Sequence, residues 1–143
     1  MAKMIFVSLP VSDLARSVAF YETIGARADP HLGDDTAQMM RVSDEICIGL
    51  LTHDRFNGFL EQTRTMADAH RTAQVLMSLS AESREEVDRI VAAVAATGAA
   101  VDITPPDDYG FMYGRNFVDP DGHIWQMTWM DAEAMKAGAE SAA

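Results

Sequence analysis

The chain has 143 residues, of which 48% are hydrophobic, and its formal net charge is −11 with only 11 Lys and Arg residues. A chain of this length suits one compact domain that buries about two-thirds of its unfolded surface. The acidic balance, without a basic cluster, argues against binding to nucleic acid or to an anionic membrane surface. No apolar run approaches the roughly 20 residues that span a bilayer.

The N-terminus and the cysteine content bear on the compartment. Residues 1–14 reach Pro10 and Asp13 too early for a signal peptide and are typical of a first β-strand. The single cysteine, Cys47, excludes an intrachain disulfide and fits a reducing compartment. Its apolar surroundings favour a buried, inert thiol. We therefore expect a soluble cytoplasmic protein.

The first half of the chain predicts a strand, a helix and further strands. Residues 4–11 are strand-like, and a helix is expected near 13–24, with Ser12 as its cap candidate and Gly25 at its end. Short strands are predicted at 37–43 and 45–51.

The second half repeats this order. A strand at 75–81 precedes a helix near 83–97, and strands are predicted at 99–104, 111–118 and 123–129. Ser8 aligns with Ser78 and Gly25 with Gly98, so a βαβββ unit occurs twice with a period of about 70 residues.

This repeat predicts an α+β fold of tandem βαβββ modules that form curved, mostly antiparallel sheets around a cavity. The modules span about 4–53 and 74–130, are joined by a polar connector at 54–73, and together make a single domain over residues 1–143.

Strand alternation sorts the side chains by face. On the first strand, Phe6 and Ser8 alternate with the residues expected beneath the helix. Ser78 takes the matching place in the second module. On the last strand, Gln126 and Thr128 are opposite to a bulky face that contains both tryptophans. We expect Gln126 to face the cavity.

Two motifs at the ends of this pattern carry a resemblance. LPVSDLARSVAFYETIG at 9–25 and DPDGHIWQMTW at 119–129, in a duplicated βαβββ unit, resemble the vicinal-oxygen-chelate superfamily. It includes glyoxalase I, extradiol dioxygenases, fosfomycin-resistance enzymes and bleomycin-resistance proteins. The resemblance covers about residues 4–130 and is more specific for the fold than for the function.

The resemblance also assigns four metal-ligand positions, one on the first and one on the last strand of each module. The histidine positions fall on Phe6 and Leu76, and the last-strand position of the first module falls on Ile48, Gly49 or Leu50. Only Gln126 keeps an oxygen donor. One amide among apolar side chains does not hold a divalent ion, so we predict no metal and no cofactor.

The four histidines do not replace these ligands in the sequence pattern. They have no H-x-H or H-x-x-x-H spacing, and surface or turn roles are expected for His31, His53, His70 and His123. A nonstandard site that uses His53 stays open as an alternative.

The segment at 105–117, PPDDYGFMYGRNF, supplies further candidate ligand-binding residues. Tyr109, Tyr113 and Arg115 together suit a planar or anionic molecule, through stacking and forked hydrogen bonds. The alternative is that Arg115 pairs with Asp107, Asp108 or Asp119 and the aromatic rings simply pack. For Gln126 the alternative is a structural hydrogen bond to neighbouring hydroxyl groups.

These observations favour a protein of the bleomycin-resistance type that binds a small planar or aromatic molecule without a metal. The predicted ligand-binding residues are Phe6, Ser8, Leu76, Ser78, Tyr109, Tyr113, Arg115 and Gln126. A divalent-metal-dependent lyase, isomerase or dioxygenase with a nonstandard site is the alternative, and a regulatory domain without a ligand is a third possibility. The resemblance also implies a homodimer.

Overall fold

The structure, a computed structural model, describes residues 1–142, with side chains up to residue 138. The chain separates into two compact units. The first comprises residues 1–72 with 120–122, and the second comprises residues 73–119 with the segment from His123 onward. None of the helices in the described residues is long and apolar enough to cross a membrane.

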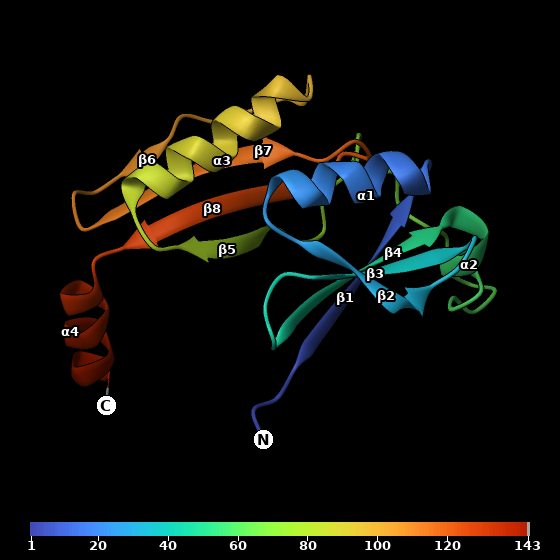
Figure 1. The fold of residues 1–143 in the computed structure, drawn as a ribbon, viewed down its shortest axis with the longest axis horizontal. Coiled ribbons are helices and arrows are strands. Elements are labelled where there is room, and N and C mark those ends of the chain that lie inside the picture. Colours follow the sequence, from blue (N-terminus) through green and yellow to red (C-terminus); the bar gives the residue numbers. More distant parts are fainter. Residues whose placement is uncertain (143) are drawn as a thin grey trace. The chain divides into compact units, whose positions relative to one another are not determined.

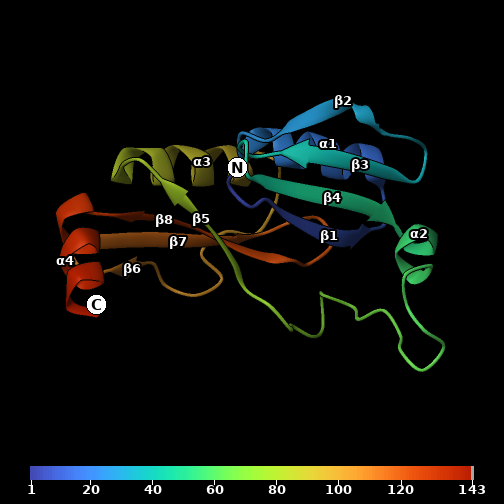
Figure 2. The ribbon, with the colours of Figure 1, turned by 90° about the horizontal axis from the view of Figure 1, so that it is seen from below.

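The first unit contains one four-stranded mixed sheet and a covering helix (Figure 1). Its elements are β1 (Ile5–Val11), α1 (Leu14–Thr23), β2 (Arg27–Gly33), β3 (Ala37–Arg41), β4 (Ile46–Thr52) and α2 (His53–Asn57). The strand order is β1-β4-β3-β2, and only the β1–β4 pair is parallel. Figure 2 shows the long connector that leads from α2 to the second unit's first strand.

The second unit repeats the arrangement with a longer helix along its sheet (Figure 1). Its elements are β5 (Met77–Ala81), α3 (Arg84–Ala96), β6 (Asp107–Asp108), β7 (Met112–Val118), β8 (Ile124–Met130) and α4 (Ala132–Ala142). The strand order is β5-β8-β7-β6, so each strand takes the place of its counterpart in the first sheet. Again only one pair, β5 and β8, is parallel.

The predicted α+β fold of two βαβββ modules is therefore confirmed, with mostly antiparallel neighbours in each sheet. The predicted helices at 13–24 and 83–97 correspond to α1 and α3. That the two modules form a single domain stays a prediction.

Three details of the strands predicted from the sequence were wrong. β2 was missed, because a polar strand that contains Pro30 at a sheet edge lacks the apolar alternation of a strand. The segment 99–104 forms only a single bridge, Val101 to Phe117, and the fourth strand is instead the two-residue β6. β5 begins at Met77, so Leu76 lies before the strand.

Each sheet buries the face that its helix covers. On α3, the predicted stripe of Val87, Ile90, Val91 and Val94 is buried. Alternation along β8 buries Trp125 and Met127, which share that side of the second sheet. The opposite sheet face of this unit is thus left for polar side chains.

The turn before β8 has a structural role that explains its two acids. The Asp119 carboxylate accepts the backbone N–H of His123 at 2.9 Å. The Asp121 carboxylate accepts the Ser12 backbone N–H at 2.8 Å and the Ser17 hydroxyl at 3.3 Å. The N-cap of α1 is Asp13, which accepts from the Arg16 backbone N–H, and not Ser12 as predicted. The Ser12 backbone is bound by Asp121 instead.

Candidate functional site

Strand register identifies the equivalent positions of the two modules. Ser8 on β1 lies opposite Gly49 on β4, and Ser78 on β5 lies opposite Gln126 on β8. Because Ser8 and Ser78 correspond in the repeat, Gly49 is the counterpart of Gln126. Of the three candidates in the first module, the register therefore selects the one with no side chain.

The residues at the four positions do not fit a metal ion. Phe6 and Leu76 offer no donor atom and are 54% and 74% exposed, Gly49 has no side chain, and a lone Gln126 amide supplies at most one oxygen. A divalent ion needs several nitrogen, oxygen or sulfur ligands. Among the described residues, no three His, Cys, Asp or Glu side chains gather in a group that could bind one elsewhere.

A cavity of about 220 Å³ opens on the second sheet, around Gln126. Its apolar walls include Leu76, Ile103 and Ile124, and its polar lining includes Ser78 and Asp107. All of these residues belong to the second unit. The expectation that Gln126 faces a cavity is met here.

The Gln126 amide is held between two polar neighbours. Its Nε2 donates to Asp107 Oδ2 at 3.1 Å, and its Oε1 accepts from the Ser78 hydroxyl at 3.5 Å. Gly114 on β7 makes room for this side chain, because a Cβ built there would lie 2.7 Å from Gln126 Nε2. The amide is thus oriented across the cavity by hydrogen bonds on both sides.

Asn116 builds a second wall of the cavity. It lies opposite Gln126 on β7 and is 8% exposed. Its Oδ1 accepts the Ile103 backbone N–H at 2.8 Å, and its Nδ2 donates to Thr104 Oγ1 at 2.8 Å. These bonds fix the segment before β6 to the sheet. Asn116 was not predicted from the sequence, although it is the polar residue next to Arg115 on β7 and points to the other face.

Arg115 and Tyr113 lie on the opposite face of the second sheet from Gln126. Both residues point toward α3, where the Tyr113 hydroxyl donates to Asp88 Oδ1 at 2.6 Å and Arg115 Nη1 donates to the same oxygen at 3.0 Å. Arg115 Nη2 also binds Asp102 Oδ2 at 2.6 Å. The structure therefore does not bring these two residues together with Gln126. Arg115 is paired, but with partners other than the three acids considered from the sequence.

This network shifts the pKa values of its members in the directions expected for hydrogen-bonded ions. The hydrogen bond to Asp102 is the main cause that raises the pKa of Arg115, and the bond to Asp88 adds to it. The bond from Tyr113 and then the Arg115 guanidinium lower the pKa of Asp88. Asp88 in turn raises the pKa of Tyr113. The positive charge of Arg115 is thus neutralised by the carboxylates of Asp88 and Asp102.

The remaining predicted residues are dispersed. Tyr109 is 62% exposed in the turn between β6 and β7, with its ring centroid 6.3 Å from that of Phe111. Phe6 and Ser8 lie on β1 in the first unit. Of the eight predicted residues, Leu76, Ser78 and Gln126 line the cavity of the second unit.

Arg84 fixes the short strand β6 and was not singled out from the sequence. Its Nη1 and Nη2 bind the Asp108 carboxylate at 3.1 and 2.7 Å, and Nη2 also donates to the Gly110 carbonyl at 3.0 Å. The guanidinium carbon lies 4.9 Å from the ring centroid of Tyr113 and 5.2 Å from that of Trp129. A planar cation thus connects α3 to the β6–β7 hairpin.

This pair predicts a pH dependence of stability. The hydrogen bonds from Arg84 lower the pKa of Asp108 from 3.8 to about 2. A carboxyl group whose pKa is lower in the folded state than in the unfolded state stabilises the protein at pH values above its unfolded-state pKa. This contribution is lost as the pH falls from 3.8 toward about 2. The melting temperature of Asp108→Asn should therefore lie below that of wild type at neutral pH, and the difference should shrink across this acid range.

Thermal melts of both proteins at closely spaced pH values measure this difference. The exposed Asp35, replaced by Asn, is the matched control, with the same change of charge outside the second unit. A difference between wild type and Asp108→Asn that stayed constant down to about pH 2 would contradict the role of the pair.

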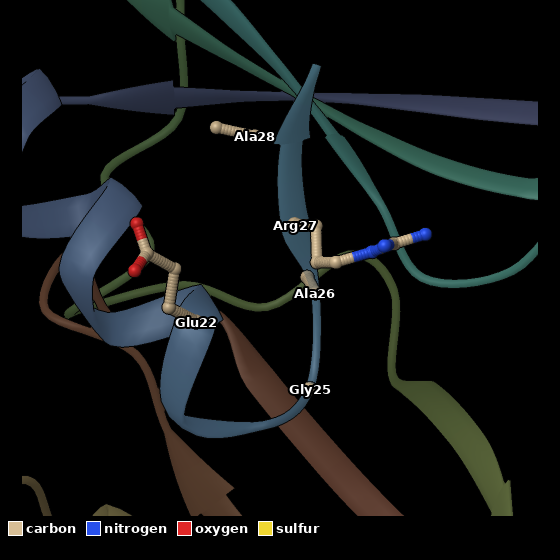
Figure 3. Close-up of a pocket in the computed structure, with 5 residues that line it drawn as sticks. All are labelled: Glu22, Gly25, Ala26, Arg27 and Ala28. Atoms are coloured by element: carbon tan, nitrogen blue, oxygen red, sulfur yellow. The ribbon is translucent and has the colours of Figure 1, made fainter. Parts of the chain in front are cut away.

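A second depression, in the first unit, does not resemble a binding site. It is lined by Glu22, Gly25, Ala26, Arg27 and Ala28, with a volume of about 450 Å³ (Figure 3). All of these residues except Ala26 are exposed. The side chains of Glu22 and Arg27 point away from each other, so no polar groups converge here.

Solved structures resemble this chain over most of its length. A hypothetical protein from S. aureus is 25% identical with a TM-score of 0.74, and the match covers 90% of this chain and 95% of that one. A glyoxalase/bleomycin resistance protein from Albidiferax ferrireducens T118 is 26% identical with a TM-score of 0.63, over 87% and 95% of the two chains. TnmS3, an antibiotic binding protein from Streptomyces sp. CB03234, is 19% identical with a TM-score of 0.63, over 92% and 98%. The last likeness concerns the fold alone.

Sequence comparison gives the family directly. No curated protein matches the chain significantly. The family profile described as the Glyoxalase/Bleomycin resistance protein/Dioxygenase superfamily matches residues 3–127, which is most of the chain. With the duplicated βαβββ modules, this match shows that the chain belongs to the glyoxalase/bleomycin resistance protein/dioxygenase superfamily.

Proposed function

We propose that this protein binds a small organic molecule, without a metal ion, in the cavity around Gln126. The observation that carries the proposal is that the Gln126 amide is held in a fixed orientation inside a cavity with apolar walls. The superfamily resemblance places a ligand oxygen at this same position. Ligand sites are typically concave and mostly apolar, with a few placed polar groups. The cavity around Gln126 likewise has apolar walls and a few polar groups, and its volume of about 220 Å³ is small for such a site.

The donor set supports metal independence. Phe6, Gly49 and Leu76 occupy the other three positions, so the Gln126 amide is free to recognise an organic group. An amide can both donate and accept hydrogen bonds. Its bonds to Asp107 and Ser78 leave one N–H and part of its acceptor capacity for a ligand.

The test of the site is a screen of small aromatic molecules by NMR, followed by titration of two cavity variants. Gln126→Ala removes the amide, and Gly114→Ala displaces it, because the added Cβ would lie 2.7 Å from Nε2. Loss of one polar contact should weaken binding by about 1–3 kcal/mol, or roughly 5- to 150-fold. Gly138→Ala is the matched control, since nothing lies within 4 Å of a Cβ there.

Thermal melts of the same variants separate binding from folding. In Gly114→Ala the crowded atom is the far end of a flexible side chain, so we expect the protein to stay folded while binding weakens. Hits that bind wild type, both cavity variants and the control equally would remove Gln126 from the site.

Metal independence has its own measurement. After dialysis against Zn, Ni, Mn or Fe salts, elemental analysis should find much less than one ion per chain, and binding of a hit should be unchanged by a chelator. Retention of one ion per chain that is lost in Gln126→Ala would instead support the metal-dependent alternative.

The proposal includes a cytoplasmic homodimer. The acidic charge and single cysteine support the compartment, and the exposed apolar side chains of Phe6 and Leu76 support self-association. Light scattering coupled to size exclusion measures the oligomeric state, and a monomer at all concentrations would contradict the dimer.

A further inference from the structure

We infer, resting on the binding site proposed above, that the ligand carries a protonated amine and that Asp107 is its recognition group. Asp107 is the residue with a formal charge among those that line the cavity. The neighbouring walls are apolar or carry neutral hydroxyl and amide groups. The charge of the site is therefore negative, which differs from the planar anion suggested by Arg115 in the sequence.

The fold directs Asp107 into the cavity. β6 consists of Asp107 and Asp108 alone, and successive side chains of a strand point to opposite faces. Asp108 is bound from the helix side by Arg84 at 2.7 Å. Asp107 consequently lies on the other face, where its Oδ2 accepts from Gln126 Nε2 at 3.1 Å.

The carboxylate of Asp107 keeps capacity for a cation. Among the described side chains it forms no ion pair, because the arginines of the second unit bind other acids. Arg84 pairs with Asp108, Arg89 with Glu86, and Arg115 with Asp88 and Asp102. A carboxylate has about four acceptor positions, of which the Gln126 amide uses one.

The cavity is of a size that suits a small amine. Its volume is about 220 Å³. Leu76, Ile103 and Ile124 favour an apolar frame beside the charge. The chemistry that fits is a small primary amine on an aromatic or aliphatic group, with its ammonium against Asp107 and its frame against the apolar walls.

A matched set of probes tests this inference. Benzylamine, benzyl alcohol and benzoate share an aromatic frame and differ in charge, and each is titrated against the full chain by NMR, with the signals of Ser78 and Gln126 reporting on the cavity. We expect benzylamine to bind about tenfold more tightly than benzyl alcohol at low salt, and benzoate most weakly. The preference should shrink as salt is added, because the pair is exposed to solvent.

Two charge-neutralising variants make the result specific. Asp107→Asn keeps an acceptor for Gln126 but removes the charge, and it should reduce the preference for benzylamine to about twofold or less. Asp35→Asn removes the same net charge at an exposed position in the first unit and should leave the preference intact.

The outcomes separate the two proposals. Equal binding of the amine and the alcohol in the cavity, unchanged by Asp107→Asn, would overturn the inference and leave the binding site standing. Tighter binding of benzoate would overturn it in the same way. If none of the probes shifts the signals of Ser78 and Gln126 at millimolar concentration, both the site and the inference fail.

Discussion

Replacing Gly122 with alanine is expected to destabilise the protein by about 2–5 kcal/mol. The residue has a φ of +95°, and a Cβ built there would lie 2.6 Å from the carbonyl carbon of Ala69 and from the backbone nitrogen of His70. A left-handed conformation costs a non-glycine residue roughly 1–2 kcal/mol, and overpacking against rigid atoms adds about 1–3 kcal/mol. Chemical denaturation of the full chain measures the sum.

Gly98 provides a control that isolates the steric part. Its φ of +90° is close to that of Gly122, but nothing lies within 4 Å of a Cβ built on it. Gly98→Ala should therefore lose only the conformational part, about 1–2 kcal/mol. Equal losses of stability in Gly122→Ala and Gly98→Ala would mean that the connector moves away from the turn at little cost in free energy.

This turn shows what a motif can and cannot reveal. The D-P-D-G sequence predicts a tight turn that a glycine completes, and the structure has a positive φ at Gly122. The sequence does not indicate that Asp121 binds the backbone of Ser12, which is 109 positions away. The conformation of a turn can be predicted because it depends on residues adjacent in the sequence. The residue that a turn side chain binds depends on the fold.

The faces of single strands were also predictable, but their mutual register was not. Alternation along β8 placed Gln126 opposite the tryptophans, and the structure agrees. For Arg115, alternation leaves two choices of face, and the pairing of Arg115 with Met127 on β8 places it on the helix side. A one-residue shift of β7 would have reversed this assignment.

Asp107 was missed as a cavity residue for a related reason. In the sequence it stands in an acidic doublet with Asp108 and was considered only as a partner for Arg115. Which acid faces the cavity depends on the bond of Arg84 to Asp108, across 24 positions of sequence. Of the polar residues that line the cavity, only Ser78 and Gln126 were predicted from the strand pattern. The others are placed there by tertiary contacts that the sequence does not indicate.

Arg115 is expected to be a stabilising residue, so that Arg115→Met lowers the free energy of unfolding by about 2–4 kcal/mol. Its guanidinium makes three hydrogen bonds, two to Asp102 and one to Asp88, at 2.6–3.1 Å. Hydrogen bonds to charged groups contribute about 1.5–3 kcal/mol each, reduced here because the carboxylates are partly exposed. The loss also leaves Asp102, a non-glycine residue with a φ of 51°, without the cation that holds its side chain.

Arg89→Met is the matched control on the same side of the sheet. Arg89 is 70% exposed and lies 3.7 Å from Glu86 one turn away on α3, so its removal should change stability little. Urea denaturation compares the two variants with wild type, and titration of a cavity ligand compares their binding. Because Arg115 lies on the face opposite to Gln126, Arg115→Met should bind the ligand with wild-type affinity below its melting temperature. A large loss of affinity in a variant that melts like wild type would instead return Arg115 to the binding site, in accordance with the expectation from the sequence.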